Sequence, residues 1–324
     1  MKIMVAGGAG YIGSALIPKL LERGYEVEVV DLLWFGCHLS KGVKVIKKNI
    51  LDLDKEDLTN IDQVIFLAGL SNDPMAEFSP SLNFIYNASA AAYLAYLSKS
   101  AKVKRYIYAG SCSSYGYTVN ELYDEESPAV SDYPYGISKL QGEQAAMQLC
   151  DENFSVICFR QGTISGYSPR MRLDLVVNTM VKSAISQREV VVNNPSIWRP
   201  ILSIEDAVSA YIRATEASAE ISSVFNIASG NYTVGEIADV VKEIVESQLN
   251  LKVKLKIKYL KDFRNYKVSF EKAMNVLSFK PRHNLESIVL NLVENLTKFE
   301  DFSNPQYYNI EVLKSICSNG RNLL

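Results

Sequence analysis

The chain has 324 residues, 34 basic against 36 acidic side chains and a formal net charge of −2. This balance argues against nucleic acid or an anionic membrane surface as a partner, and no apolar stretch reaches the length of a membrane span. Five scattered cysteines without a Cys-x-x-Cys pair, together with only two histidines, indicate a cytoplasmic setting and argue against a metal site.

The first residues read MKIMVAGGAGYIGS, in which a short apolar run at 3–6 is followed at once by glycines. Gly7, Gly10 and Gly13 stand in the order G-x-x-G-x-x-G, and a helical pattern continues to residue 22. In a dinucleotide fold the first glycine allows a tight turn, the second admits a diphosphate and the third lets the helix pack closely on the strand. We therefore expect a diphosphate at the N-terminus of this helix, where free N–H groups favour negative charge.

A second apolar strand, predicted at 26–30, ends in Asp31, eighteen residues after Gly13. A carboxylate at this position can accept both hydroxyl groups of an adenosine ribose and would repel a 2′-phosphate. The sequence therefore predicts NAD, rather than NADP, as the cofactor. Tyr11 and Ile12, which lie between the last two glycines, belong to the expected cofactor contact.

Apolar strands then alternate with helical patterns, which is typical of a doubly wound parallel sheet of the Rossmann type. Further strands are predicted at 43–47, 63–67, 105–109 and 155–160, and helices at 81–100 and 134–150. These two helices carry many small residues, which either pack tightly on their own sheet or form the interface of a homodimer.

The regular alternation ends near residue 165, so we expect an NAD-binding domain over 1–165 and a smaller α+β domain over 166–324 that binds the substrate. A helix at 204–217 and a strand at 224–228 are expected to return to the first domain within a segment of about 203–228. The stretch LKVKLKIKY at 251–259 alternates strictly. Its apolar residues Leu251, Val253, Leu255 and Ile257 should face inward, and the lysines should face water at a sheet edge rather than bind phosphate.

Chemistry is expected where the serine-rich end of one strand, SCSSYG at 111–116, meets the start of the helix at 134–150. Tyr135 and Lys139 are four residues apart and so share one helix face. A free tyrosine titrates near pH 10, and lowering its pKa toward ~7 requires about 4 kcal/mol of differential stabilisation of the phenolate. The Lys139 ammonium together with an oxidised nicotinamide could supply it, and Tyr135 would then take a proton from a substrate hydroxyl.

With these motifs the chain resembles the extended short-chain dehydrogenase/reductase family that acts on nucleotide sugars. The resemblance runs over most of the chain and rests on GGAGYIGS at 7–14, NILD at 49–52, FLAG at 66–69, SCSSYG at 111–116, WRPILSIED at 198–206 and FNIASG at 225–230. It implies that Ser111 holds the reacting oxygen and that Lys139 also binds the nicotinamide ribose. Further cofactor contacts implied by the resemblance are Asn49, Ile50, Leu67, Ala68, Gly69 and Asn87. The substrate contacts that it implies, besides Ser111, are Ser71, Asn178, Arg199 and Arg264.

Departures from the family pattern narrow the expected reaction. Dehydratases of this family carry an Asp-Glu pair directly after the hydroxyl residue, where this chain has Cys112 and Ser113. The family's decarboxylases need a glutamate, and its 3,5-epimerases a cysteine, at the place of Ser113. Cys112 is expected to be a packed thiol. What remains is a minimal site of Ser111, Tyr135, Lys139 and NAD, which oxidises one sugar hydroxyl, expected to be at C4.

Three reactions are compatible with such a site: a 4-dehydrogenase, a 4-epimerase and a 4-ketoreductase that runs the dehydrogenase step backward. The strings at 67–74, 168–181 and 307–316 resemble a bacterial group linked to capsular polysaccharide, which favours a 4-dehydrogenase acting on a GDP-linked heptose. The alternative is a UDP-hexose 4-epimerase that works through a transient 4-keto sugar. A function of a different class, non-catalytic sensing of NAD(H), would predict the loss of Ser111, Tyr135 or Lys139, and all three are present.

Overall fold

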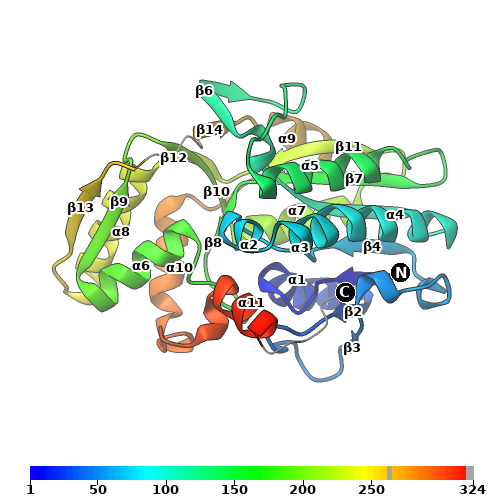
Figure 1. The fold of residues 1–324 in the computed structure, drawn as a ribbon, viewed down its shortest axis with the longest axis horizontal. Coiled ribbons are helices and arrows are strands. Elements are labelled where there is room, and N and C mark those ends of the chain that lie inside the picture. The colour runs from blue at the N-terminus through cyan, green and yellow to red at the C-terminus, as the bar shows by residue number, and fades with distance from the viewer. Residues whose placement is uncertain (261–264, 319–324) are drawn as a thin grey trace.

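The structure is a computed structural model that describes residues 1–260 and 265–318. Its centre is a seven-stranded sheet with the strand order β11-β7-β5-β4-β1-β2-β3, in which every neighbouring pair is parallel (Figure 1). The strands are β1 (Lys2–Ala6), β2 (Glu26–Asp31), β3 (Lys44–Lys47), β4 (Gln63–Phe66), β5 (Arg105–Ser111), β7 (Ser155–Gln161) and β11 (Ser223–Ile227). The predicted fold class, a doubly wound parallel sheet, is confirmed.

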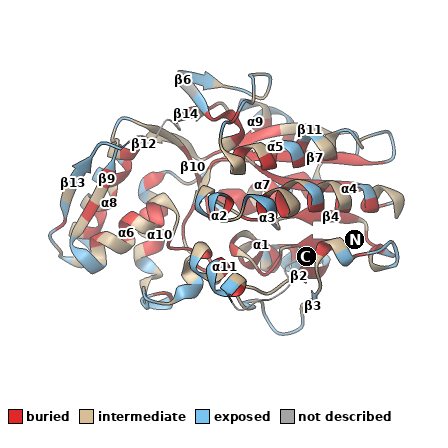
Figure 2. Ribbon diagram, in the orientation of Figure 1, coloured by how far each residue is buried: buried red, intermediate tan, exposed pale blue. Residues whose placement is uncertain are grey.

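Helices cover both faces of this sheet because its central strands are apolar on both sides. Along β1, Ile3 and Val5 pack against α1 (Tyr11–Glu22) and α7 (Ile204–Glu216). Met4 and Ala6 face the opposite side, toward α4 (Ala90–Ser100) and α5 (Pro134–Met147). Figure 2 shows the strands of the sheet buried between these layers.

The helix predicted over 81–100 is in fact interrupted. It consists of α3 (Pro80–Phe84), a π-helical turn (Ile85–Ser89) and α4, and it is preceded by α2 (Asp73–Phe78). The alanines of α4 at positions 90, 91 and 95 are fully buried against the molecule's own sheet. Their small size therefore serves packing within the chain, and association of two chains through these helices stays a prediction.

A second apolar core is built around three helices that follow β7 in the chain. Its helices are α6 (Val176–Gln187), α8 (Val234–Leu249) and α10 (Leu285–Glu294), which pack on one another through buried aliphatic side chains. The smaller sheets contain β8 (Thr163–Ser165), β10 (Trp198–Ser203) and β12 (Gly230–Thr233); β9 (Glu189–Asn193) with β13 (Lys254–Lys258); and β6 (Tyr117–Tyr123) with β14 (Asn265–Val268). The helices α9 (Glu271–Leu277) and α11 (Asn309–Ser318) complete the described chain.

One expectation about the lysine-rich strand is wrong. Val253 is buried, but Ile257 is 56% exposed although the alternation placed it in the core. Within residues 1–260 and 265–318, β13 pairs with β9 alone, in a two-stranded sheet. Alternation predicts which residues share a face, whereas the neighbouring elements decide how far along the strand that face is covered.

The glycine loop supplies a prediction about stability. Gly7 and Gly24 both have a positive φ, at 78° and 77°, but a Cβ on Gly7 would lie 2.5 Å from Ala68 N, whereas a Cβ on Gly24 would meet nothing within 4 Å. We expect Gly24→Ala to destabilise the cofactor-free protein by about 1–2 kcal/mol, the cost of the left-handed conformation. Gly7→Ala should lower the free energy of unfolding by about 1–3 kcal/mol more than Gly24→Ala does, because the backbone at Ala68 must also move. If chemical denaturation showed that both variants lose the same free energy of unfolding, this account of Gly7 would be contradicted.

Candidate active site

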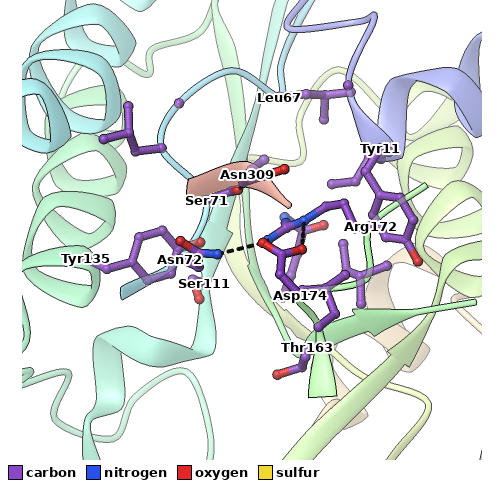
Figure 3. A pocket seen from close by; sticks show the side chains of 18 of the residues that line it. Tyr11, Leu67, Ser71, Asn72, Ser111, Tyr135, Thr163, Arg172, Asp174 and Asn309 are labelled. Atoms are coloured by element: carbon purple, nitrogen blue, oxygen red, sulfur yellow. Dashed lines mark hydrogen bonds and ion pairs between the residues drawn. The ribbon is translucent and has the colours of Figure 1, made fainter. Parts of the chain in front are cut away.

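A cavity of about 680 Å³ opens at the carboxyl ends of the central strands. One wall consists of the loops that follow β1, β2, β4 and β5, and the other wall comes from residues beyond 160 (Figure 3). Because parallel strands end at the same sheet edge, the loops that carry the predicted motifs meet here. Nearly all residues predicted to bind the cofactor line this cavity: Gly7, Gly10, Tyr11, Ile12, Asp31, Asn49, Ile50, Leu67, Ala68, Gly69, Tyr135 and Lys139.

The glycine loop leaves an open helix N-terminus at the cavity. Gly10 is the N-cap of α1, and no side chain caps that end. Gly13 packs instead of lining the cavity, because a Cβ there would lie 2.2 Å from Gly8 O. The uncapped N–H groups and the helix dipole suit a diphosphate, so the residues present fit a dinucleotide.

Asp31 borders the same part of the cavity at the end of β2. Its carboxylate accepts hydrogen bonds from the backbone N–H groups of Ala9 at 3.0 Å and Leu33 at 2.8 Å. Burial raises the pKa of this carboxyl group, and the two backbone donors oppose that effect. The two N–H groups thus fix the carboxylate where a ribose can donate its hydroxyls to it.

Asn87, like Gly13, does not line the cavity. It is fully buried in the π-helical turn, and its Nδ2 donates to Leu70 O at 2.9 Å and to Asn83 Oδ1 at 2.8 Å. A Cβ on Gly69 would lie only 2.1 Å from Asn87 Oδ1. In this structure Asn87 supports the loop beneath the cofactor groove, and the predicted direct contact is corrected to that role.

Ser111, Tyr135 and Lys139 converge because β5 ends beside the first turns of α5. The Lys139 Nζ donates to Ala109 O at 3.0 Å, and burial lowers the Lys139 pKa to about 8. Burial raises the Tyr135 pKa to about 12, while hydrogen bonding to Ser111 and the charge of Arg172 oppose that rise. The expected lowering of the Tyr135 pKa is therefore not a property of the protein alone.

An ion pair that the sequence analysis did not identify lies in the middle of the cavity. Arg172 binds Asp174 through two hydrogen bonds of 2.9 and 3.0 Å, and Asn72 Nδ2 donates to Asp174 Oδ2 at 2.8 Å (Figure 3). These contacts join the two walls of the cavity, since Asn72 is the N-cap of α2. The signal in the sequence is the alternation of charged with apolar residues in RMRLD at 170–174.

The predicted substrate residues have different surroundings. Ser71 lines the cavity and accepts a hydrogen bond from Asn309 Nδ2 at 2.6 Å, and Arg199 lines it with its guanidinium over the ring of Tyr266. Arg264 lies outside the described residues. Asn178 is only 1% exposed, and the direct substrate contact predicted for it does not fit this structure.

The Asn178 amide is used within the protein. Its Oδ1 accepts from Gly166 N at 3.1 Å, and its Nδ2 donates to Arg172 O at 2.8 Å and to the Tyr11 hydroxyl at 3.2 Å. It therefore positions the backbone that carries Arg172. Sequence likeness gave the correct neighbourhood for this residue, but only the fold shows that its polar atoms are engaged by Gly166, Tyr11 and Arg172.

Cys112 is buried beside the catalytic wall, and its thiol donates to Arg160 O. Burial raises its pKa far above the ordinary value, so it stays protonated and packed, in line with the expectation from sequence. Among the described residues there is no cluster of His, Cys, Asp or Glu side chains that could hold a metal. No helix in that part of the chain is long and apolar enough to cross a membrane.

The buried Lys139 predicts a pH dependence of stability. Its pKa falls from 10.5 in the unfolded chain to about 8 in the folded protein, so between these values the unfolded chain holds a proton that the folded protein has released. Stability due to this group therefore rises with pH across that range, by up to ~3 kcal/mol at ~1.4 kcal/mol per pKa unit.

The change should be visible as a difference between wild type and Lys139→Met in urea denaturation of cofactor-free protein from pH 7 to 10. Lys252→Met is the matched control, because Lys252 is exposed. A wild type that gains no stability relative to Lys139→Met as the pH rises would contradict the lowered pKa.

Comparison with known proteins places this site in a family. Residues 3–228 match the NAD dependent epimerase/dehydratase family. The UDP-glucose 4-epimerase of Halalkalibacterium halodurans is 26% identical over 315 residues, which covers 89% of this chain and 93% of the relative. The UDP-glucose 4-epimerase of Lactobacillus helveticus is 25% identical over 319 residues, which covers 89% of this chain and 95% of the relative.

Solved structures agree with this match. The UDP-glucose 4-epimerase of Thermotoga maritima, solved with UDP-glucose, aligns with a TM-score of 0.82 and 25% identity over 93% of this chain and 100% of that chain. MoeE5 in complex with UDP-glucose and NAD aligns with a TM-score of 0.81 and 24% identity, over 91% of this chain and 98% of that chain. This second match shows a similar fold. Since the family match spans well over half of the sequence, the chain belongs to the NAD dependent epimerase/dehydratase family, whose cofactor is NAD.

Proposed function

We propose that this protein is a 4-epimerase of UDP-linked hexoses that works through a transient 4-keto sugar. The observation that carries the proposal is the meeting of Ser111, Tyr135 and Lys139 at the cavity, next to the loops that fit NAD. The full-length likeness to UDP-glucose 4-epimerases supports the choice of C4 and of a UDP-linked sugar.

In the proposed reaction Tyr135 Oη accepts the proton of the C4 hydroxyl, and Ser111 Oγ holds the same sugar oxygen by a hydrogen bond. When bound, NAD supplies a reversible acceptor for the C4 hydride. Burial keeps Tyr135 protonated in the protein alone, although the hydrogen bond to Ser111 and the charge of Arg172 act to lower its pKa. In the proposed reaction the Lys139 ammonium and an oxidised nicotinamide would add positive charge that favours the phenolate. After the keto sugar has turned, Tyr135 returns the proton to the same oxygen, and the product is the C4 epimer.

The two residues that directly follow Ser111 disfavour loss of water from the sugar. Dehydration needs a further acid or base that moves protons at the carbons next to C4. The residues after Ser111 are a buried thiol, Cys112, and the hydroxyl of Ser113. Asp174 also lines the cavity, but Arg172 and Asn72 hold its carboxylate, and its pKa is lowered chiefly by Arg172.

The other proposal for the reaction is the one that the sequence strings favoured, a 4-dehydrogenase that releases the keto product of a GDP-linked heptose. The relatives described above are named for UDP-linked sugars, and this supports the epimerase over the dehydrogenase. For either substrate, Arg199 at the cavity wall suits the sugar-nucleotide diphosphate, because a guanidinium can bind two phosphate oxygens at once.

The test is incubation of the full chain and NAD with UDP-glucose, UDP-galactose, UDP-N-acetylglucosamine and GDP-linked heptose in deuterated water, followed by NMR and mass spectrometry. We expect a UDP-hexose of unchanged mass, inverted at C4, without deuterium on the carbons. A product lighter by two hydrogens with accumulating NADH would instead establish the dehydrogenase. Loss of water would contradict the minimal site.

Tyr135→Phe is the matched variant for this test. It removes the proton acceptor and keeps the ring, so sugar-nucleotide binding should persist while turnover falls by ~100-fold or more. Turnover near the wild-type rate would show that Tyr135 is not the base. Binding of NAD without turnover of any sugar by wild type would favour the sensing function.

Asp31 should determine the choice of cofactor. Its carboxylate, held by Ala9 and Leu33, would face the 2′-phosphate of NADP at close range. Wild type should bind NAD far more tightly than NADP, and Asp31→Asn, which keeps the shape and loses the charge, should narrow the ratio by at least ~10-fold. Isothermal titration of cofactor-free protein measures both affinities, and a ratio near one in wild type would refute this role.

A further inference from the structure

Arg170 is a buried guanidinium that the proposed reaction does not use. It is 2% exposed and borders the cavity, and its guanidinium carbon lies 3.9 Å from the ring centroid of Phe35. Its Nη2 donates to Asn309 Oδ1, while its Nε has no hydrogen-bond partner within residues 1–260 and 265–318. A guanidinium removed from water with a donor left over is costly unless an anion compensates it.

The nearby carboxylates are committed to other groups. Asp174 binds Arg172 through both of its oxygens, and the Asp31 carboxylate accepts from two backbone N–H groups. Burial lowers the Arg170 pKa to about 9, and the neighbouring charge of Arg172 acts in the same direction. The described protein thus holds a positive charge at the cavity wall without a hydrogen-bonded carboxylate of its own.

The position of Arg170 indicates which anion would pair with its guanidinium. Its electrostatic partners include Asp31, where the adenosine ribose is expected, and Tyr11, the first residue of α1. The path of a dinucleotide runs between these two points, and its diphosphate belongs at the uncapped N-terminus of α1. We propose that Arg170 is the counter-ion of the cofactor diphosphate, presented by the segment that follows β8 and held there by Asn309 of α11.

The helix α11 is well placed for this task. Its first residue, Asn309, accepts from Arg170 and donates to Ser71 Oγ at 2.6 Å, so it ties the guanidinium to the loop after β4. Leu313 is buried against Leu70 and Met75. Figure 1 shows α11 near α2, with which it is in contact. The guanidinium of Arg170 is thus held in place by contacts that reach both α11 and the loop after β4.

The test compares Arg170→Met with the matched control Arg213→Met, since Arg213 is exposed on α7. Calorimetry on cofactor-free full-length protein measures the affinity for ADP-ribose, adenosine and UDP. Arg170→Met should weaken ADP-ribose binding by about 10- to 100-fold, the range of a charge-assisted contact. The affinities for adenosine and for UDP should stay within about 2-fold of those of the wild type. Arg213→Met should change none of them. If UDP binding falls and ADP-ribose binding does not, the guanidinium serves the substrate diphosphate and the proposal is overturned.

Thermal unfolding separates a binding role from a structural one. Arg170→Met removes a poorly compensated buried charge, so the Tm of cofactor-free protein should stay unchanged or rise. The increase in Tm caused by NAD should shrink, because a ligand stabilises in proportion to its affinity. Asn309→Ala should weaken ADP-ribose binding in the same direction but less. A lower Tm without NAD, together with unchanged ADP-ribose affinity, would show that Arg170 acts only in packing and would overturn the proposal.

Discussion

The cavity depends on the close approach of the glycine loop to its neighbours. Gly7 turns with a positive φ directly against the backbone of Ala68, and Gly13 brings α1 onto the backbone of Gly8. No side chain fits at either contact, so α1 begins at the edge of the sheet with its N–H groups facing the cavity. The loops after β1 and β4 thereby become neighbours at the cavity, and the predicted cofactor residues Gly7, Gly10, Leu67, Ala68 and Gly69 lie on them.

Buried positive charge is the second feature that unites the site. Lys139, Arg170 and Arg172 all border the cavity and are all buried, and burial lowers the pKa of the first two. Arg172 alone has a carboxylate bound at hydrogen-bond distance, that of Asp174. Desolvated cations of this kind raise the free energy of the ligand-free protein and favour anionic ligands. A cofactor and a substrate that each carry a diphosphate fit this electrostatic arrangement.

The polar contacts that cross the cavity explain how the two walls act together. Asn72 reaches Asp174, and Ser71 accepts from Asn309, so α2 and its preceding loop are tied both to the 170–174 segment and to α11. These residues lie 102 and 238 positions apart along the chain. The tyrosine whose pKa must fall for proton transfer is influenced by Arg172, a member of the same network. Binding and proton transfer therefore share one set of buried charges.

Local patterns determined the sheet, the glycine loop, Asp31 and the convergence of Ser111, Tyr135 and Lys139, because each depends on spacing within one element or at the end of one strand. The tertiary structure decided the burial and the contacts of individual side chains, which residue spacing along the sequence does not determine. It turned Asn87 and Asn178 into supports, left Ile257 exposed on a strand with one neighbour, and gathered Arg170, Arg172 and Asn309 at the cavity. Burial, and with it the pKa of each charged group, is set by residues far away in the sequence. A sequence therefore determines which chemistry is present, and only the packed fold determines which groups face the ligand and how strongly they are charged.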